Sequence, residues 1–174
     1  DYKILLARDD IDVVSIALPN YLHAAVALDA LKAGKHVMLD KPMATNARDA
    51  ARLVAEAKKR AVLFMVGQNN RFTPEVQTLK QLIAKGVLGD VYHGKTAWTR
   101  RTGIPRIGSW FTQTKFAGGG STYDIGVHAL DRCLFLMGEF DAVAVSGQTY
   151  SKFGSRGLGE GSWGRSEIDP KKPF

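Results

Sequence analysis

Cysteine is nearly absent from the sequence: among 174 residues, only Cys133 carries a thiol. One thiol excludes an internal disulfide, so nothing indicates an oxidising compartment, and a packed core thiol is the favoured interpretation of Cys133. Long apolar runs are absent too, because none approaches the roughly 20 residues that span a bilayer. No internal repeat is apparent. We therefore expect a cytoplasmic globular protein without a membrane partner.

Positive charge is in excess but is not concentrated. The 24 Lys and Arg residues outnumber the 17 Asp and Glu residues, for a net charge of +7. Such an excess suits anionic ligands or nucleic acid. The densest basic group is Arg100, Arg101 and Arg106, and no nucleic-acid-binding motif accompanies it. We expect no nucleic-acid partner. The group could serve an acidic or phosphorylated sugar, but a solvated surface is the favoured interpretation.

The first part of the chain alternates short apolar runs with helical segments. β-Branched apolar runs predict buried strands of a parallel sheet. Gly34 is placed to end the first helix, and Thr45 to cap the second. The predicted order is strand 12–18, helix 21–33, strand 36–40, helix 46–60 and strand 62–66. Short crossovers of this kind give parallel neighbours, so we expect half of a doubly wound sheet.

Polar residues follow each of the three predicted strands. They are Pro19-Asn20, Lys41-Pro42 and the segment 67–71, which contains Asn70 and Arg71. The carboxyl ends of parallel strands share one edge of the sheet, where ligands bind. Amides, a lysine and an arginine suit a ligand with hydroxyl or phosphate groups. The alternative is that Pro, Asn and Gly stand there as turn formers.

The pattern changes after about residue 72. Predicted elements are a helix over 74–85, a strand over 91–101, a long connection over 103–117, a helix over 118–137 and a strand over 141–150. Longer strands separated by a helix favour an α+β domain with an open, mostly antiparallel sheet. We therefore predict an α/β protein with two partial domains, residues 1–72 and 73–174. The second sheet looks incomplete, because two strands are few for stability.

Three glycines, 118–120, lead into the predicted helix that carries Asp124 and His128. Glycine lets the backbone approach a ligand closely. Residues four apart lie one turn apart on one helix face, and a carboxylate beside an imidazole orients a general base. A solvated helix pair or a satisfied core histidine is the alternative. A metal site at these two residues and Asp131 lacks further ligands, so we expect none.

Four segments, taken in order, resemble the Gfo/Idh/MocA family of nicotinamide-dependent oxidoreductases. The carriers are residues 12–23, residues 33–42, Asn70-Arg71-Phe72, and Gly118-Gly119-Gly120 through Asp124 to His128. The family's Glu-Lys-Pro motif stands here as Asp40-Lys41-Pro42, with a shorter acid. The family's Gly-x-Gly-x-x-Gly turn, which seats the pyrophosphate, is expected upstream of residue 1, and further substrate-domain strands downstream. On this resemblance the chain is an internal fragment.

The resemblance implies roles for individual residues. Lys41, Asp124 and His128 become the catalytic residues, with Lys41 between nicotinamide and substrate and His128 as the base. The implied residues that face the NAD or NADP cofactor are Pro19, Asn20, His23, Asp40, Lys41, Pro42, Asn70 and Arg71. The implied substrate is a sugar or polyol, and family members often pair through the open sheet, so we expect a homo-oligomer. Two alternatives are a glycoside hydrolase that uses bound NAD for a transient oxidation and a non-catalytic sugar or dinucleotide sensor.

Overall fold

The chain forms two compact units, each of which combines segments distant in sequence. The computed structural model describes residues 1–100, 103–156 and 161–163. One unit consists of residues 1–67 and 110–124, and the other of residues 68–109 and 125–174. The first unit therefore includes a stretch from the second half of the chain, which sequence reasoning did not predict.

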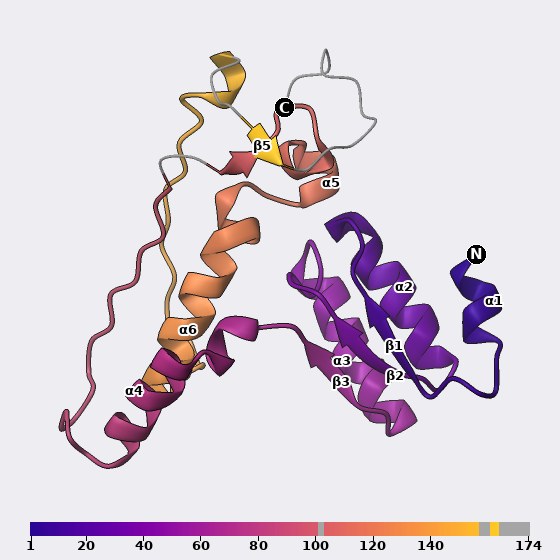
Figure 1. Ribbon diagram of the computed structural model, residues 1–174, viewed down its shortest axis with the longest axis horizontal. Helices are drawn as coiled ribbons and strands as arrows, with labels where there is room; N and C mark the ends of the chain where they lie inside the picture. Colours follow the sequence, from indigo (N-terminus) through magenta and orange to yellow (C-terminus); the bar gives the residue numbers. More distant parts are fainter. Residues whose placement is uncertain (101–102, 157–160, 164–174) are drawn as a thin grey trace. The chain divides into compact units, whose positions relative to one another are not determined.

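The first unit is built on a three-stranded parallel sheet, as predicted (Figure 1). Strand order is β1-β2-β3, with Ile16 beside Leu39 and Leu39 beside Val66. Its elements in chain order are α1 (Tyr2–Leu6), β1 (Val13–Ile16), α2 (Asn20–Lys32), β2 (His36–Leu39), α3 (Ala47–Arg60) and β3 (Phe64–Val66). The α/β class with half of a Rossmann-like sheet is thus confirmed.

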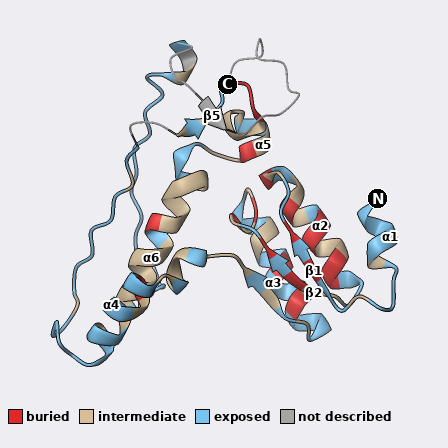
Figure 2. Ribbon diagram, in the orientation of Figure 1, coloured by how far each residue is buried: buried red, intermediate tan, exposed pale blue. Residues whose placement is uncertain are grey.

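The core of this unit lies between one face of the sheet and the helices α2 and α3. Alternate strand residues such as Val14, Val37 and Leu39 are buried against Leu31 of α2 and Leu53 of α3. The period of two in the strands and the helical spacing of the apolar residues in α2 and α3 meet at this layer. Figure 2 shows the resulting buried band along the strands and the two helices.

The opposite face of the sheet is exposed. Val13 is 60% exposed, Met38 49% and Met65 45%, and Ser15, Met38 and Met65 stand side by side in the register. Both crossover helices pack on the other face, because consecutive right-handed crossovers in one direction place their helices on the same side.

Two helix boundaries show how local sequence sets the fold. Gly34 adopts a φ of +74° just beyond α2, as expected for a glycine at that position. The prediction that Thr45 caps α3 was wrong: the cap is Asn46, whose side chain accepts a hydrogen bond from the Asp49 N–H at 2.9 Å. Asparagine caps as well as threonine does, and only the backbone geometry distinguishes the two adjacent residues.

The segment 110–124 packs on the first unit through three short elements. They are η2 (Trp110–Thr112), α5 (Thr114–Ala117) and the first part of η3 (Thr122–Gly126). The buried Asn20 side chain donates from Nδ2 to the Ala117 carbonyl at 2.8 Å, and the rings of Tyr21 and Phe116 lie 5.0 Å apart. Both contacts come from the N-terminal end of α2, so the segment lies beside the carboxyl end of β1.

The second unit is mainly helical in its described part. Helix α4 (Pro74–Ala84) packs against α6 (Val127–Met137), and η1 (Asn69–Phe72) contacts both. The Lys80 ammonium donates to the carbonyls of Phe135 and Leu136, at 2.7 and 3.3 Å. Because the last carbonyls of a helix have no partner within it, this lysine closes the end of α6. The remaining elements are β4 (Ile104–Pro105), η4 (Gly154–Arg156) and β5 (Gly161–Trp163).

The strand predictions for this second unit were wrong. Residues 91–100 and 141–150 are extended but form no strand, and residue 101 lies outside the described residues. The pair β4–β5 runs parallel, where an antiparallel sheet was predicted. Alternation of apolar and polar side chains suits a pleated chain, but a strand also needs a neighbouring strand to bond to.

Truncation of the Leu31 side chain should show how much the core of the first unit contributes to the free energy of unfolding. Leu31 is fully buried, so Leu31→Ala should lower the free energy of unfolding by about 2–5 kcal/mol. Leu63→Ala is the matched control: Leu63 is 74% exposed, and its truncation should cost less than about 0.5 kcal/mol. Urea unfolding followed by circular dichroism measures both. Equal losses would contradict the placement of this core.

Gly118→Ala should destabilise the packing of segment 110–124. Gly118 has a φ of +81°, and a Cβ there would lie 2.7 Å from Cγ2 and 2.8 Å from Cβ of Thr45. Gly34→Ala is the control, since Gly34 has a similar φ of +74° with nothing within 4 Å. We expect Gly34→Ala to cost about 1–2 kcal/mol and Gly118→Ala about 1–3 kcal/mol more in unfolding free energy. Equal costs for the two variants would show that segment 110–124 does not pack closely on Thr45.

Candidate functional site

The carboxyl edge of the parallel sheet gathers the residues predicted from sequence. Pro19 and Asn20 follow β1, and Asp40, Lys41 and Pro42 follow β2. Pro42 is buried, Pro19 is half-buried and Asp40 is exposed, with Oδ1 accepting the Lys41 backbone N–H at 2.7 Å. The Lys41–Pro42 peptide bond is cis. The hydrogen bond from its N–H to the Asp40 side chain thus fixes the Lys41 backbone at the sheet edge.

The Lys41 side chain reaches a carboxylate 83 residues away in sequence. Its ammonium Nζ lies 3.1 Å from Asp124 Oδ1 and also donates to the Asp124 carbonyl oxygen. The side chains are 16% and 21% exposed, so water screens this pair only partly. Two of the three predicted catalytic residues therefore form one ion pair within the first unit.

The side chains of Asn20 and His23 are occupied within the protein. Asn20 is 6% exposed and holds the Ala117 carbonyl, as described above. His23 is fully buried, with Nδ1 2.7 Å from the Pro42 carbonyl oxygen and Nε2 2.7 Å from that of Leu18. Both residues were predicted to face a cofactor. That role stays a prediction. Within the protein, the Asn20 side chain bonds to segment 110–124, and the His23 ring bonds to the two loops that follow β1 and β2.

Sequence reasoning missed Tyr123 and Thr45 as parts of this site. The Tyr123 hydroxyl donates to the Thr45 carbonyl oxygen at 3.2 Å, next to the close approach of Gly118. Gly119 lies against the Tyr123 ring. The only sequence signal was the run of aromatic residues Trp110, Phe111 and Phe116 in a long connection, which indicates packing but not the partner.

Asp124 and His128 stand on consecutive helical turns of different geometry. Asp124 lies in η3, which is a π-helical turn, and His128 lies in the first turn of α6. A helix was predicted here, but not the wider turn, and π turns are frequent at functional sites. His128 is half-buried, and its ring centroid lies 6.1 Å from that of Trp98. Asp124 belongs to the first unit and His128 to the second.

Arg71 forms a bidentate ion pair with Asp131 inside the second unit. Arg71 Nε lies 2.8 Å from Asp131 Oδ2, and Arg71 Nη2 lies 2.5 Å from Asp131 Oδ1. The hydrogen bonds to Asp131 raise the pKa of Arg71, and the guanidinium carbon lies 5.3 Å from the Phe135 ring centroid. Asp131 is thereby engaged by a cation, as Asp124 is by Lys41, which leaves little support for a metal held by these acids.

The residues after β3 add one buried acceptor. Asn70 Nδ2 donates to the side chain of its neighbour Asn69, at 3.1 Å. Gln68 Oε1 is buried and, among the described residues, has no hydrogen-bond partner. Buried amide oxygens are normally bonded, so this atom is available to a ligand donor.

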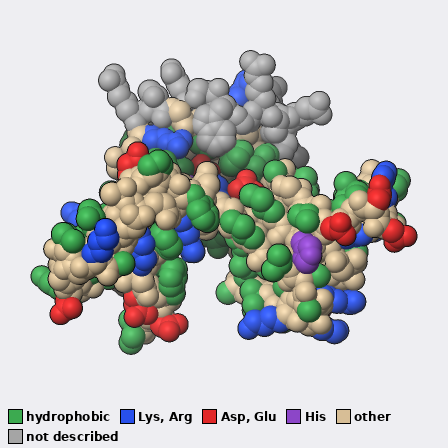
Figure 3. Space-filling model, turned by 60° about the horizontal axis from the view of Figure 1, so that its bottom comes forward, with side chains coloured by type: hydrophobic (Ala, Val, Ile, Leu, Met, Phe, Trp, Pro, Cys, Tyr) green, Lys and Arg blue, Asp and Glu red, His purple; other side chains and the backbone are tan. Residues whose placement is uncertain are grey.

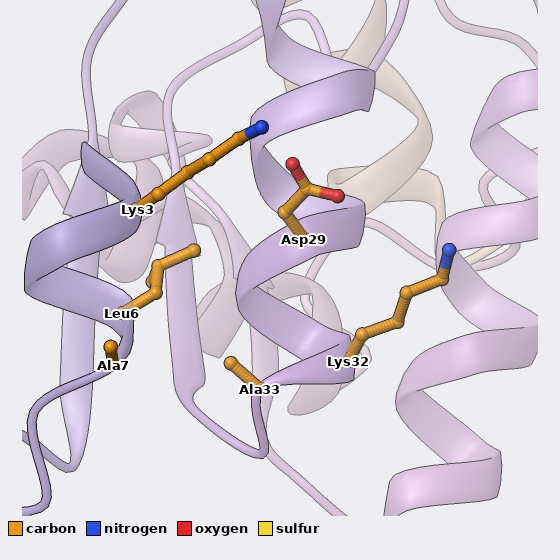
Figure 4. Close-up of a pocket in the computed structure, with 6 residues that line it drawn as sticks. All are labelled: Lys3, Leu6, Ala7, Asp29, Lys32 and Ala33. Carbon is orange, nitrogen blue, oxygen red and sulfur yellow. The ribbon is translucent and has the colours of Figure 1, made fainter. Parts of the chain in front are cut away.

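A hollow lies beside α1, away from the sheet edge. It is about 400 Å³ in volume and lies between α1 and the last turns of α2, as Figure 4 shows. Asp29 on its wall accepts a hydrogen bond from the Tyr2 hydroxyl at 2.7 Å, which raises the pKa of Tyr2. The lining consists of Lys3, Leu6, Ala7, Asp29, Lys32 and Ala33. Two lysines and one acid that already has a partner do not make a catalytic constellation.

The basic side chains on the face drawn in Figure 3 are dispersed. Figure 3 shows Lys and Arg side chains in several separate groups with hydrophobic side chains between them. Arg100 lies over the Trp98 ring at 5.4 Å and donates to the Gly103 carbonyl, Arg106 is exposed, and Arg101 lies outside the described residues. Within the described part of the chain, no helix has the length and apolar character needed to cross a membrane.

The chain is similar to known oxidoreductases over most of its length. It is 36% identical over 157 residues to D-glucoside 3-dehydrogenase of Escherichia coli, covering 90% of this chain and 44% of that protein. It is 35% identical over 147 residues to levoglucosan dehydrogenase of Pseudarthrobacter phenanthrenivorans, covering 82% and 37%. The chain therefore spans about two fifths of the length of these relatives.

Solved structures give the same result. A levoglucosan dehydrogenase in complex with NADH and levoglucosan matches with a TM-score of 0.70 and 34% identity, covering 80% of this chain and 38% of that one. An aldose-aldose oxidoreductase from Caulobacter crescentus, complexed with glycerol, matches with a TM-score of 0.66 and 32% identity, covering 79% and 40%.

Two family models divide the chain between them. The model of the oxidoreductase family with an NAD-binding Rossmann fold matches residues 1–68, and the model of the GFO/IDH/MocA C-terminal domain matches residues 76–160. Sequence relatives and structural neighbours agree with this family assignment. The chain belongs to the Gfo/Idh/MocA family of oxidoreductases.

Proposed function

We propose that the protein containing this chain transfers a hydride between a carbinol carbon of a sugar or polyol and NAD or NADP. The observation that carries the proposal is the Lys41–Asp124 pair at the carboxyl edge of the parallel sheet. Topology places ligands at that edge. A half-buried ammonium there, held by a carboxylate from a distant segment, is a preorganised hydrogen-bond donor for a substrate oxygen.

The residues at this edge fit the nicotinamide half of a dinucleotide. Pro19, Asp40, Lys41 and Pro42 lie in the two strand-end loops, and His23 bonds to the backbone of both loops. Gln68 Oε1 supplies a buried acceptor at the residue after Gly67. The contact of Asn70 and Arg71 with a cofactor stays a prediction, because the Arg71 guanidinium is engaged by Asp131.

The chemistry assigned to the chain is proton handling and orientation. NAD or NADP, when bound, supplies the acceptor for the hydride that leaves the carbinol carbon. In the proposed step His128 takes the hydroxyl proton, so that the alcohol becomes a carbonyl. Lys41 donates a hydrogen bond to the reacting oxygen. Asp124 holds the Lys41 ammonium and lies four residues before His128, on the preceding turn.

A sugar is the favoured substrate class because the named relatives act on sugars. Levoglucosan dehydrogenase and D-glucoside 3-dehydrogenase carry sugar substrates in their names, and one neighbour structure contains levoglucosan.

Assembly with further copies of the chain is part of the same proposal, resting on the family resemblance. The domain division at residues 72 and 73 is likewise proposed, and it lies close to the compact-unit boundary at residues 67 and 68.

The 174-residue chain should bind NADH mainly through the nicotinamide half of the dinucleotide. In the described first unit, the crossover from β1 to α2 contains no glycine, so it offers no close backbone cradle for the pyrophosphate. We expect saturable quenching or enhancement of NADH fluorescence, competition by reduced nicotinamide mononucleotide, and no competition by AMP. Displacement of NADH by AMP would show that the chain binds the other half. If NADH does not bind saturably, the sheet edge is not a cofactor site in the isolated chain.

His128→Ala should lower turnover of a full-length protein that carries this sequence. Loss of positioned acid–base help should reduce kcat about 10²–10⁴-fold and leave the cofactor Kd nearly unchanged. His93→Ala is the control, since His93 is exposed in the same unit. The assay is net formation of NADH or NADPH with a panel of sugars and polyols. Unaltered kcat would refute the role of His128, and substrate turnover without net reduced cofactor would favour the NAD-using hydrolase.

A further inference from the structure

The fully buried His23 joins two loops that are far apart in sequence. One ring nitrogen faces the Pro42 carbonyl and the other faces the Leu18 carbonyl, each at 2.7 Å. Leu18 follows β1 and Pro42 follows β2, so a single imidazole spans the carboxyl ends of two adjacent strands. His23 itself lies in the first turn of α2, which fixes where the ring can reach.

The two acceptors restrict what can replace the histidine. Carbonyl oxygens only accept hydrogen bonds, and an imidazole donates from each nitrogen that carries a proton. A side chain of similar size without an N–H could bond to neither carbonyl, and the Pro42 carbonyl would lose its bond in a buried position. Leaving buried acceptors unbonded is costly, so loss of the ring nitrogens should release the loops rather than keep them in place.

Pro42 is the residue next to Lys41. The Lys41 backbone N–H bonds to Asp40 Oδ1 on one side, and the carbonyl of Pro42 is held by His23 on the other. Asp40 is exposed, whereas His23 is 0% exposed, so the histidine is the anchor that water does not compete with. The Lys41 ammonium then extends from this fixed backbone to Asp124.

We propose that His23 is a positioning residue for Lys41: it holds the loop 40–42 so that the Lys41 ammonium meets Asp124. His23 acts through Lys41 and contacts no reacting atom. Its importance for turnover rests on the proposed function, but its effect on the Lys41 side chain does not. The family resemblance implies that His23 faces the cofactor, and that contact stays a prediction. The positioning role rests on the separate contact of His23 with the backbone next to the lysine.

Chemical labelling of lysines in the 174-residue chain tests this role directly. A small amine-reactive acetylating reagent is applied, and the modification rate of Lys41 is read by mass spectrometry. Lys35, whose Nζ donates to the Arg8 carbonyl at 2.7 Å in the same unit, is the internal reference. His23→Phe should raise the relative rate at Lys41 about tenfold, as expected for the loss of hydrogen bonds worth roughly one power of ten in equilibrium.

Two further variants separate positioning from general loosening. His23→Gln keeps an amide nitrogen with two N–H donors and should restore most of the slow labelling. His36→Phe removes another histidine of the same sheet, whose Nδ1 accepts the Leu63 N–H at 2.9 Å, and should leave Lys41 labelling unchanged. Wild-type labelling in a folded His23→Phe variant, or an equal rise in His36→Phe, would overturn the proposal.

A measurement on the unmodified sequence covers the case in which His23→Phe does not fold. In ¹³C,¹⁵N-labelled chain, the ring N–H of His23 that faces Pro42 should exchange slowly with solvent and show a scalar coupling to the Pro42 carbonyl carbon. A rapidly exchanging ring without such coupling would overturn the proposal.

In the full-length protein, His23→Phe should lower kcat more than it raises KM, with rescue by His23→Gln. Fast labelling without loss of kcat would keep the positioning role and refute catalysis by Lys41.

Discussion

The ion pair between Lys41 and Asp124 is the contact on which the candidate site depends. It joins the end of β2 to a segment 83 residues later in the chain, and the carboxylate lies in a π-helical turn. Around it, Asn20 holds Ala117 and Tyr123 holds Thr45. The strands could form without these contacts, but the sheet edge would then lack an acid beside its lysine.

The sequence was sufficient where local pattern and topology agree. β-Branched runs and Gly34 predicted the parallel strands and the end of α2, and the rule that ligands meet the carboxyl edge selected Asn20 and Lys41 before the structure was known. It was insufficient where a contact depends on distant residues. The spacing of Asp124 and His128 does not show that Lys41 forms an ion pair with Asp124. It also does not show that the side chains of His23 and Arg71 bond to other residues of the protein.

The predictions of strands over 91–101 and 141–150 were wrong for the same reason. Their side chains alternate as those of a strand do, and most residues in both segments are exposed. A strand is stable only when its N–H and C=O groups find a neighbour, and the described residues provide none for these segments. Helix α6 and its closure by Gly138, at a φ of +77°, were predictable because a helix satisfies its own backbone.

The exposed face of the parallel sheet has a consequence for the chain in solution. Apolar Val13, Met38 and Met65 lie on this face, one on each strand, and the outer edge of β1 has no neighbour among the described strands. Such an edge is a template for intermolecular pairing. A net charge of +7 keeps copies apart at low ionic strength, but the Debye length falls to about 8 Å in physiological salt. Colloidal stability of the isolated chain should therefore decline as salt is added.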